Sequence, residues 1–323
     1  MPFDDLSERQ HAERALLSLA AFGLATTRAA AERHRRSKQF PDYLSLHAVD
    51  GGRVVGQLGV LRFPYAFRDG IETVAGLAGV ATHPGRARQG VARALLEEAH
   101  AREESEGIRH VTLWTNSSWG AHRLYEQYGY RDVHSPAWAV HAGEGPPIPG
   151  TAARRAPPGP VRVRPGRPAD VPALERLYAA YAKNRLGFRR WNDSLGNSVR
   201  AGRVDPARDL RVAERGVAPL GYVHVSASPD RTICSEMVAA AEPVRRALLR
   251  AVSDVAGGGV WAFHCSPVAD HPELFPKEEF ALSPVHWWTF MARDRGSDWE
   301  RRAAVRRFAT SDPRFLCLGG DRF

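Results

Sequence analysis

The sequence has few cysteines and no long apolar run. Its three cysteines, Cys234, Cys265 and Cys317, are too few and too far apart for a disulfide framework, and they suit a reducing compartment. No stretch reaches the roughly 20 apolar residues of a membrane-spanning helix. The first ten residues lack the apolar core of a signal peptide. We therefore expect a cytoplasmic protein with no membrane partner.

The familiar metal and nucleotide signatures are also missing. Neither the G-x-x-x-x-G-K-[ST] loop nor a G-x-G-x-x-G loop followed by a ribose-binding acid occurs. The 13 histidines show no HExxH or CxxC type of spacing, so the sequence predicts no metal. Cys265 follows His264 but has no third group in view to orient the pair, so a buried core cysteine is the better interpretation.

Lysine is scarce as well: arginine supplies 42 of the 45 basic side chains, and the net charge is +9. A basic protein attracts anions such as phosphates or nucleic acid. Acidic and basic residues alternate along most of the chain, however, and no DNA or RNA recognition motif accompanies the charge. The pattern argues against a nucleic-acid partner.

The chain is long enough for two domains, each with its own core. Residues 143–160 hold six prolines and four glycines in eighteen residues, which is typical of a linker. We therefore expect domains at residues 1–142 and 161–323. In the second, strands at 221–226 and 232–240, a helix at 243–256 and a strand at 260–264 repeat the order of elements in the first.

In the first domain, hydrophobic periodicity and turn residues predict an alternation of strands and helices. A helix covers Leu6 to Ser37, and no convincing opening strand precedes it. The later elements are strands at 43–49, 53–63 and 73–82, a helix at 89–106, a strand at 109–116, a helix at 118–128 and a last strand at 130–140. Asp50-Gly51-Gly52 is expected to join the first two strands as a hairpin turn.

The chain is organised around Leu77 to Leu96, where an apolar strand breaks at His83-Pro84-Gly85 and a helix begins at Gly90. The first amides of a helix have no intrahelical partner, and the helix dipole is positive there, so this turn predicts an anion site. Gly90 and Ala92 leave room for a phosphate to approach the backbone. Arg86, Arg88 and Arg93 add positive charge nearby.

Two motifs resemble those of the GCN5-related N-acetyltransferases (GNAT). The segment Ala87-Arg88-Gln89-Gly90-Val91-Ala92 resembles the family's pyrophosphate loop, Arg/Gln-x-x-Gly-x-Gly/Ala, with Ala87 where the family has Arg or Gln. Further on, Ala121, Tyr125, Gly129 and Tyr130 fall in register with Asn-x-x-Ala-x-x-x-Tyr-x-x-x-Gly-Phe/Tyr. Ser118 stands at the Asn position, and Asn116 lies two residues before it.

This resemblance implies an α/β (α+β) fold of two tandem GNAT-like domains, each a mixed, mostly antiparallel sheet flanked by helices. It implies acetyl-CoA as co-substrate in the first domain, bound by Asn116, by Ser118 and by residues of the strand end, the loop and the helix start. These last residues are Val80, Ala81, Thr82, Arg86, Ala87, Arg88, Gln89, Gly90, Val91, Ala92 and Arg93. The second domain has Glu242-Pro243 at the equivalent turn, with an acid that repels phosphate and an imide without N–H. We expect it to be a degenerate copy.

The tandem arrangement resembles the enhanced-intracellular-survival type of acetyltransferase, without the sterol-carrier-like domain of that type. In that type the terminal carboxylate acts as base, a role that stays open for Phe323 here. Mycothiol synthase is a second two-copy relative of similar length, but its catalytic copy is the second one.

The implied chemistry is acyl transfer from a thioester to an amine. A backbone amide near Ala81 or Thr82 is expected to bind the developing oxyanion. Tyr125 is expected to protonate the leaving thiolate, since its phenol is protonated at neutral pH. The strand before the loop has no carboxylate, so Glu72, one turn earlier, and His83, at the strand's end, are the candidates for a base acting through water.

Three hypotheses stay open from the sequence. The first is an N-acetyltransferase that acts on a primary amine of a small molecule or a peptide. The second is an acyl-CoA-binding or sensing protein without catalysis, and the third a basic protein associated with nucleic acid on the same scaffold. A homo-oligomer is compatible with all three. Four tryptophans in the second half could line an acceptor pocket, although core packing is their commoner use: Trp261, Trp287, Trp288 and Trp299.

Overall fold

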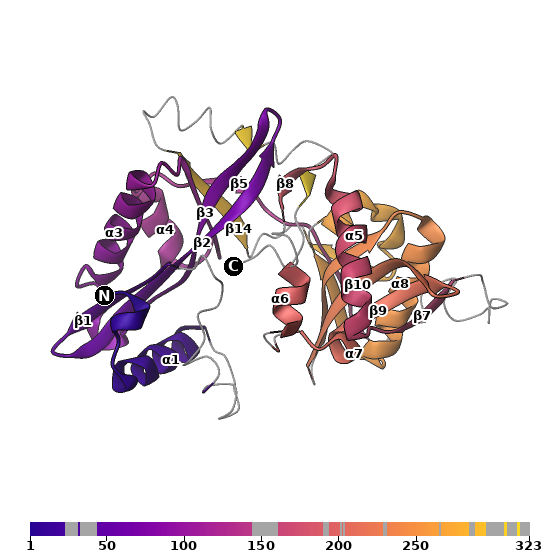
Figure 1. Cartoon of the computed structure of the whole chain (residues 1–323), viewed down its shortest axis with the longest axis horizontal. Coiled ribbons are helices and arrows are strands. Elements are labelled where there is room, and N and C mark those ends of the chain that lie inside the picture. The colour runs from indigo at the N-terminus through magenta and orange to yellow at the C-terminus, as the bar shows by residue number, and fades with distance from the viewer. Residues whose placement is uncertain are drawn as a thin grey trace.

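Two β-sheets, each flanked by helices, form the two bodies of the molecule (Figure 1). The computed structural model describes residues 1–22, 32, 44–143, 161–189, 194–200, 202, 204–228, 231–264, 266–283, 288–294, 307–308 and 315–316. Residues 1–143 are called the N-terminal half below, and those from 161 onward the C-terminal half. The interpretation of 144–160 as a linker, and the predictions for Cys265, Cys317, Trp287, Trp299 and Phe323, lie outside the described residues.

The N-terminal half follows the predicted alternation closely, although the part of the predicted helix Leu6 to Ser37 beyond Phe22 lies, apart from residue 32, outside the described residues. Its elements are α1 (Glu8–Phe22), β1 (Leu44–Asp50), β2 (Arg53–Phe67), β3 (Gly70–Thr82), α3 (Val91–Ser105), β4 (His110–Thr115), α4 (Gly120–Gln127), β5 (Arg131–His134) and β6 (Trp138–His141). Gly51 and Gly52 both have positive φ, as the two central residues of a type I′ turn require, so the predicted hairpin is confirmed.

The C-terminal half repeats the order of three strands, a helix and a strand, and it has further elements before and after this core. Its elements are β7 (Arg162–Pro165), α5 (Val171–Ala182), β8 (Leu186–Phe188), α6 (Ser194–Arg200), α7 (Pro206–Asp209), β9 (Leu210–Arg215), β10 (Ala218–Ser228), β11 (Arg231–Ala239), α8 (Glu242–Ala256), β12 (Val260–His264), α9 (Ser266–Asp270), β13 (Phe280–Ser283), β14 (Thr289–Asp294) and β15 (Phe315–Leu316). The predicted strands and helix of this half are confirmed.

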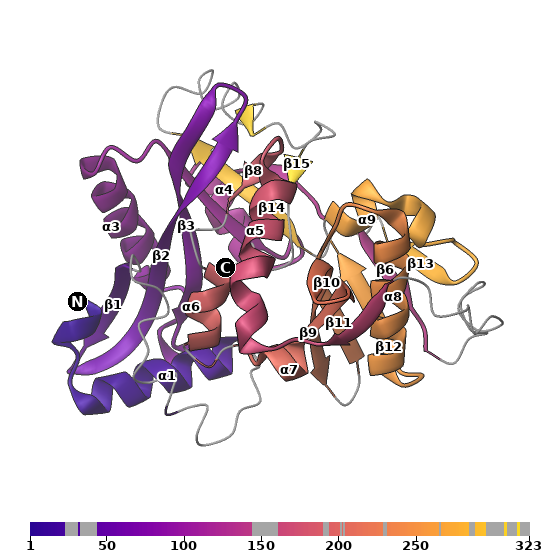
Figure 2. The same ribbon diagram turned by 45° about the vertical axis from the view of Figure 1, so that its right-hand side comes forward.

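The two halves exchange a strand. In the first sheet the order is β15-β8-β2-β3-β4-β14-β5, with β1 on β2, and in the second it is β13-β6-β12-β11-β10-β9-β7. Strand β14 of the C-terminal half therefore lies between β4 and β5, and β6 of the N-terminal half lies between β12 and β13 (Figure 2). The prediction that 130–140 ends the first sheet is wrong after His134, since β6 belongs to the second sheet.

The strands predicted at 53–63 and 73–82 are also longer than expected: β2 continues through Pro64 to Phe67, and β3 begins at Gly70. Proline lacks an N–H and is tolerated where its nitrogen does not face a continuous ladder. On that side of β2 the pairing with β1 ends at Val60 and the pairing with β8 begins at Tyr65. Pro64 occupies the gap between the two pairings.

No regular strand precedes α1 in the described residues, as the sequence indicated. Instead Pro2 forms a single antiparallel bridge with Leu46 of β1, and the amino group of Met1 donates a 2.8 Å hydrogen bond to His47 O. In the second sheet β7 occupies the equivalent edge against β9. The N-terminus thus takes the place of an edge strand.

Helices and inserted segments cover both faces of the first sheet. On one face α3 packs on Leu58, Val60, Leu77 and Leu113, and Tyr125 of α4 joins the same core. On the other face Leu17 of α1 packs on Val54 and Ala81, while an aromatic cluster covers the middle of the sheet. That cluster includes Phe188 and Phe290, so the C-terminal half supplies part of the cover.

Candidate functional site

The parallel strands β3 and β4 separate before they end. They pair only from Ala75–Val111 to Leu77–Leu113. Beyond that point Ala78 to Thr82 pair with β2 alone, and Trp114 and Thr115 pair with β14 alone. The described residues therefore leave an opening between the two strands, called the splay below. Backbone donors and acceptors of β3 face it without a strand partner.

A β-bulge sits on β3 inside the splay. The register with β2 jumps from Gly59–Ala78 to Gln57–Ala81, and Gly79 has φ +61°. Gln57 Nε2 donates a 3.1 Å hydrogen bond to Gly79 O. A bulge leaves its extra residue outside the ladder and re-aims the backbone. The bulge thereby frees one backbone amide, of Gly79 or Val80, from strand pairing. This amide lies close to the predicted oxyanion donors, Ala81 and Thr82, but belongs to a different residue.

The turn after β3 ends in an uncapped helix N-terminus. Gly90 precedes α3 with φ +84°, and no side chain caps the helix. The amides of Val91, Ala92 and Arg93 begin the helix, so they have no intrahelical partner and carry the positive end of its dipole. A Cβ placed on Gly90 would meet nothing within 4 Å, so the backbone directly before these amides is open on that side. This geometry suits a phosphate group.

A glycine that the sequence reading missed holds α3 against the sheet. A Cβ at Gly56 of β2 would overlap Val91 Cγ1 and approach Leu95 Cδ1 to 3.1 Å. The first turn of α3 can therefore sit on β2 only because residue 56 has no side chain. Thr82, the register partner of Gly56, has a buried Oγ1 without a hydrogen-bond partner among the described residues.

The arginines of the loop differ in how they are engaged. Arg86 forms an ion pair with Asp50 of the β1–β2 turn and donates to Gln89 Oε1. Arg88 lies at φ +61° and is exposed, and Arg93 is exposed on the first turn of α3. Ala87 contributes a backbone bond to Pro84 O that closes the short 3-10 turn Pro84–Arg86. Arg88 and Arg93 are the more mobile charges beside the helix start.

Tyr125 lies in the core under α3, on the same sheet face as Leu77 and Leu113 at the inner end of the splay. Burial raises the pKa of Tyr125 to about 12. The ring meets Tyr130 edge-to-face, with 5.8 Å between centroids. A phenol in this state keeps its proton well above neutral pH, as a general acid must.

The structure does not bring Glu72 to this site. Glu72 is at the start of β3, ten residues before Thr82, which corresponds to about 33 Å of strand. Its carboxylate binds Arg307, and this ion pair lowers its pKa. The sequence reading placed it one turn from the strand's end, whereas the extended strand carries it to the opposite edge of the sheet.

His83 does lie at the strand end, where it caps the 3-10 turn. Its Nδ1 accepts a 3.1 Å hydrogen bond from the Gly85 amide. The only basic lone pair of the neutral imidazole is thereby used, because the other ring nitrogen carries the proton. A role as base would require this bond to break.

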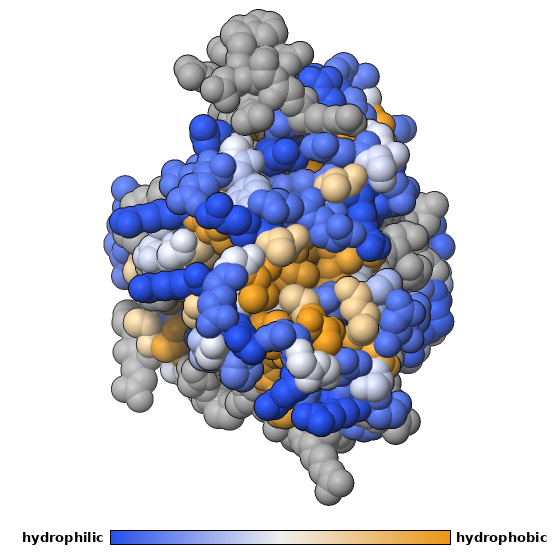
Figure 3. Space-filling model, turned by 90° about the vertical axis from the view of Figure 1, so that its left-hand side faces the viewer, coloured by the Kyte–Doolittle hydropathy of each residue, from blue (hydrophilic) through white to orange (hydrophobic). Residues whose placement is uncertain are grey.

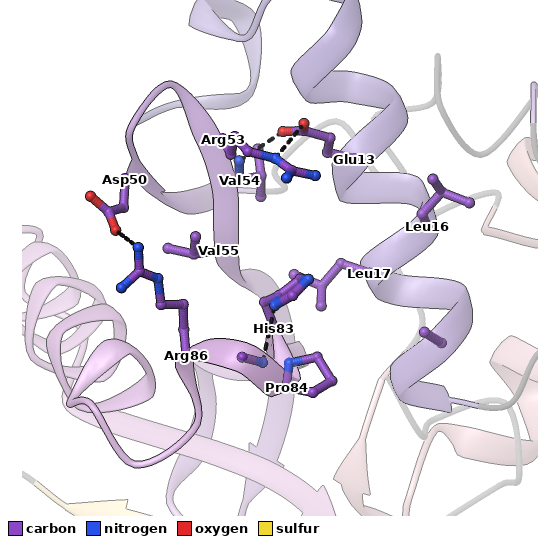
Figure 4. A pocket seen from close by; sticks show the side chains of 12 residues that line it. Glu13, Leu16, Leu17, Asp50, Arg53, Val54, Val55, His83, Pro84 and Arg86 are labelled. Carbon is purple, nitrogen blue, oxygen red and sulfur yellow. Dashed lines mark hydrogen bonds and ion pairs between the residues drawn. The ribbon is translucent and has the colours of Figure 1, made fainter.

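His83 also borders a hollow of about 390 Å³ between α1 and the β1–β2 hairpin (Figure 4). Leu16 and Leu17 line it from α1, and Glu13 bonds the Arg53 side chain and the Val54 amide at its edge. Figure 3 shows apolar surface gathered near the middle of this side of the molecule, within a frame of polar side chains.

Asn116 and Ser118 follow β4 at the same edge of the sheet as the loop, since the carboxyl ends of parallel strands lie together. Asn116 Oδ1 accepts from the amide and the hydroxyl of Ser118, at 2.9 and 2.7 Å. This turn leads into α4, which carries Tyr125.

The C-terminal half repeats the splay but closes it. Strands β11 and β12 pair up to Cys234–Phe263, the counterpart of Leu77–Leu113. Gly221 faces Val244 as Gly56 faces Val91. Counted from these pairs, Tyr222 replaces Gln57 and Glu236 replaces Gly79, and the Tyr222 hydroxyl donates to the buried Glu236 carboxylate. Between Ala239 and Val244 the turn has four residues, against eight between Thr82 and Val91.

No three His, Cys, Asp or Glu side chains among the described residues group as metal ligands would. None of their helices combines the length and apolar character needed to cross a membrane. Of the remaining tryptophans, Trp261 is buried in the second core and Trp288 packs against Trp119 at the start of α4.

Comparison with known proteins agrees with this geometry. Residues 5–133 match the family model of an acetyltransferase (GNAT) domain, and no curated protein matches the sequence. A GCN5-related N-acetyltransferase from Kribbella flavida has a TM-score of 0.65 at 20% identity, over 90% of this chain and 70% of that one. A tandem GNAT protein from the clavulanic acid biosynthesis pathway gives 0.58 at 17%, over 92% and 98%. Eis1 from Mycobacterium abscessus gives 0.55 at 16%, over 88% and 72%. At these identities the structures share a fold with this chain.

Proposed function

We propose, from the premise that residues 5–133 carry a GNAT acetyltransferase domain, that the protein moves an acetyl group from acetyl-CoA to a primary amine by direct attack in a ternary complex. Residues 1–142 would form the catalytic domain, 143–160 a linker and 161–323 the degenerate copy. One observation carries the proposal: an uncapped helix start behind Gly90 and a splayed strand pair lie side by side in the N-terminal half.

The residues of this half fit the two ends of acetyl-CoA. The pyrophosphate would rest on the amides of Val91 to Arg93, where Gly90 leaves open space. The remaining loop residues, Arg86 to Gln89, and Asn116 and Ser118 at the same sheet edge would surround it. The pantetheine arm carries amides, and the unpaired edge of β3 from Ala78 to Thr82 offers them backbone partners.

The residues of the C-terminal half do not fit acetyl-CoA in this way. Its helix α8 begins with Glu242-Pro243, and Arg245 Nη1 donates to Ala240 O within the shortened turn. Tyr222 and Glu236 fill the places that Gln57 and Gly79 hold in the first half. We therefore place a single co-substrate site per chain.

Acetyl-CoA supplies a thioester carbonyl that an amine can attack. As the C–N bond forms and the C–S bond breaks, an amide of the Gly79 bulge would donate to the oxyanion. Tyr125 would give its proton to the departing sulfur from the α3 face of the sheet, and the proton that the amine loses would return through solvent.

The described part of β3 between Val74 and Thr82 holds no carboxylate, and His83 Nδ1 is engaged. We therefore propose that the amine enters in its neutral form. This lack of a base is also what favours the second candidate, an acyl-CoA-binding protein without catalysis.

Free-thiol release from acetyl-CoA with a panel of primary amines, combined with mass analysis of the product, separates the two. Amine-dependent thiol release and a product heavier by one acetyl group are expected. Tight CoA binding with no release above the acetyl-CoA blank for any amine would leave the binding protein as the function. Absence of CoA binding would overturn both.

A further inference from the structure

Besides Thr82 Oγ1 of β3, two buried polar atoms of the described residues lack a hydrogen-bond partner on the strand segments that flank the splayed part of β3, one on β2 and one on β4. In the described part of the chain, Gln57 Oε1 and Trp114 Nε1 are shielded from solvent and bonded to nothing. The two residues expose 7% and 8% of their surface. Buried polar groups nearly always have a partner, and one left alone destabilises the fold. An unpartnered acceptor and donor beside a binding site therefore point to a ligand that completes them.

Both atoms belong to the sheet face opposite Tyr125. Leu58 and Leu113 pack with Tyr125 beneath α3. Gln57 and Trp114 are each one residue along the strand, so their side chains leave from the other face. The Gln57 amide bonds Gly79 O at the bulge, and Trp114 directly follows the last pair between β3 and β4. A group that threads the splay would have Tyr125 on one side and these two atoms on the other.

The C-terminal half provides an internal comparison. There Tyr222 and Glu236 occupy the positions of Gln57 and Gly79 and satisfy each other. Neither has an atom among the unpartnered buried ones. At equivalent positions, the buried polar groups are thus bonded to each other in the C-terminal half but lack partners in the N-terminal half. The N-terminal half is also the one with the proposed phosphate-binding turn before α3.

The surroundings are aromatic, and the described carboxylates on the neighbouring strands are already paired. Trp114 lies in one cluster with Phe63, Phe188 and Phe290, and its ring is 5.0 Å from that of Phe290. The carboxylates of the neighbouring strands are engaged: Glu72 with Arg307, and Asp132 with His122 and Thr289. The chain as a whole carries +9. These features disfavour a polycation and favour an apolar or aromatic body.

We propose that the acceptor is a monoamine with an aromatic or apolar body and a neutral oxygen beside the amine, such as an α-amino amide or a β-amino alcohol. Its amine N–H donates to Gln57 Oε1, and its neighbouring oxygen accepts from Trp114 Nε1. The inference rests on the proposed acetyl transfer, for which it names the substrate class. Gln57 and Trp114 are positioning residues, because they hold the amine and take no part in bond making.

The test measures binding of three amines to the CoA-loaded chain by calorimetry: phenylalaninamide, 2-phenylethylamine and spermidine. Phenylalaninamide should bind about tenfold more tightly than 2-phenylethylamine, which lacks the oxygen, because one hydrogen bond is worth about that factor. Spermidine should bind more weakly than both. In Trp114→Phe the tenfold preference should vanish, and Gln57→Leu should weaken both aromatic amines about tenfold. Trp119→Phe, which removes a tryptophan at the exposed start of α4, is the matched control and should leave all three unchanged.

Spermidine binding as tightly as the aromatic amines, or an undiminished preference for phenylalaninamide in Trp114→Phe, overturns the inference. The wild-type comparison of the three amines decides the case even where a variant fails to fold. Each titration is repeated without CoA. If CoA does not bind, the proposed function is contradicted. The order of the three amines by binding affinity, measured without CoA, still decides the acceptor class.

Discussion

At the scale of single residues, the environment of Tyr125 determines the pH dependence of the proposed reaction. Burial raises its pKa to about 12, so the protonated, donating form persists well above neutral pH. No described carboxylate of β3 lies near the bulge to assist the amine. The rate should therefore rise with pH as the amine loses its proton.

We predict that kcat/KM rises about tenfold per pH unit below the pKa of the acceptor amine and shows no falling limb up to pH 10. Tyr125→Phe should lower kcat roughly 100-fold, within the usual range for loss of a general acid, with CoA affinity nearly intact. Thiol release between pH 6 and 10 measures both. A decline in rate above pH 8, or wild-type turnover in Tyr125→Phe, would exclude Tyr125 as the proton donor.

A second residue-scale prediction concerns acid stability. The Tyr130 hydroxyl and His100 Nε2 are 2.8 Å apart in the core, and burial lowers the pKa of His100 to about 3. Below pH 6.5 the unfolded chain binds a proton at this histidine that the folded chain does not. Its contribution to stability is therefore complete above pH 6.5 and is lost as the pH falls toward 3, by about 1.4 kcal/mol per unit.

Urea unfolding of the wild type and of His100→Gln at pH 7, 5.5 and 4 checks this prediction. The variant should be less stable at pH 7. The difference in free energy of unfolding between the wild type and the variant should narrow by about 3–4 kcal/mol at pH 4. A constant difference at all three pH values would show that His100 titrates alike in both states.

The conformation of the loop at Gly90 could be predicted from the sequence, because a glycine and a helix start are recognisable within a few neighbouring residues. Gly90 has a positive φ directly before α3, a conformation that glycine adopts without strain. Glu72 could not be placed correctly without the true length of β3, and Gln57 and Trp114 carry no sequence signal. Their importance comes from lacking a partner in three dimensions, which only the structure shows.

At the scale of elements, the position of α3 depends on the strand beneath it. Gly56 permits the contact with Val91 that holds the first turn of the helix on β2. Gly56→Val should displace this turn, reduce stability by about 1–3 kcal/mol as overpacking does, and weaken CoA binding at least tenfold. Calorimetry with CoA and thermal unfolding measure the two effects.

Gly221→Ala provides the control for this prediction, because a Cβ there would also be crowded: it would lie 2.7 Å from Ala239 Cβ and Val238 O and 3.0 Å from Val244 Cγ1 of the following helix. It should reduce stability as well but leave CoA affinity unchanged. Equal losses of affinity in both variants would mean that destabilisation alone explains the effect.

Element types were predictable from periodicity, but strand partners were not. The short strands β6 and β14, with four and six residues, carry nothing in their sequence that selects a sheet. Their exchange is a property of the assembled chain. Arg109 shows how it is stabilised, since its guanidinium bonds the buried Asp294 carboxylate of β14 from the start of β4.

At the scale of the whole molecule, the exchanged strands make the two halves interdependent. Without β14, strand β4 would lose its partner toward β5, and without β6 the same would happen to β12 and β13. An open sheet edge of this kind is both unstable and prone to association. The C-terminal half thus has a structural role, and its Phe188 and Phe290 also cover the face of the first sheet that carries Trp114.

We predict that residues 1–160 and 161–323, expressed separately, show no cooperative thermal unfolding, and that co-expression restores it together with CoA binding. Circular dichroism during heating measures this. Cooperative unfolding of residues 1–160 alone would show that the exchange contributes little to stability.

The tandem repeat could be predicted from the sequence, and so could the difference between the turns before α3 and α8, because a missing glycine and an added proline are visible without a structure. The closing of the second splay by Tyr222 and Glu236 was not, since it depends on the register of β10 and β11. Both observations lead to the same central claim, that CoA binds once per chain at the start of α3.

Calorimetric titration with CoA of the wild type, Gly90→Asp and Gly216→Asp tests this claim most directly. Gly216 lies in the β9–β10 turn with φ +62° and open space around it, as Gly90 does, so it controls for backbone strain and added charge. The account predicts one CoA per chain in the wild type and in Gly216→Asp, and a loss of affinity of at least 100-fold in Gly90→Asp. Two CoA molecules per chain, or unchanged affinity in Gly90→Asp, would contradict it.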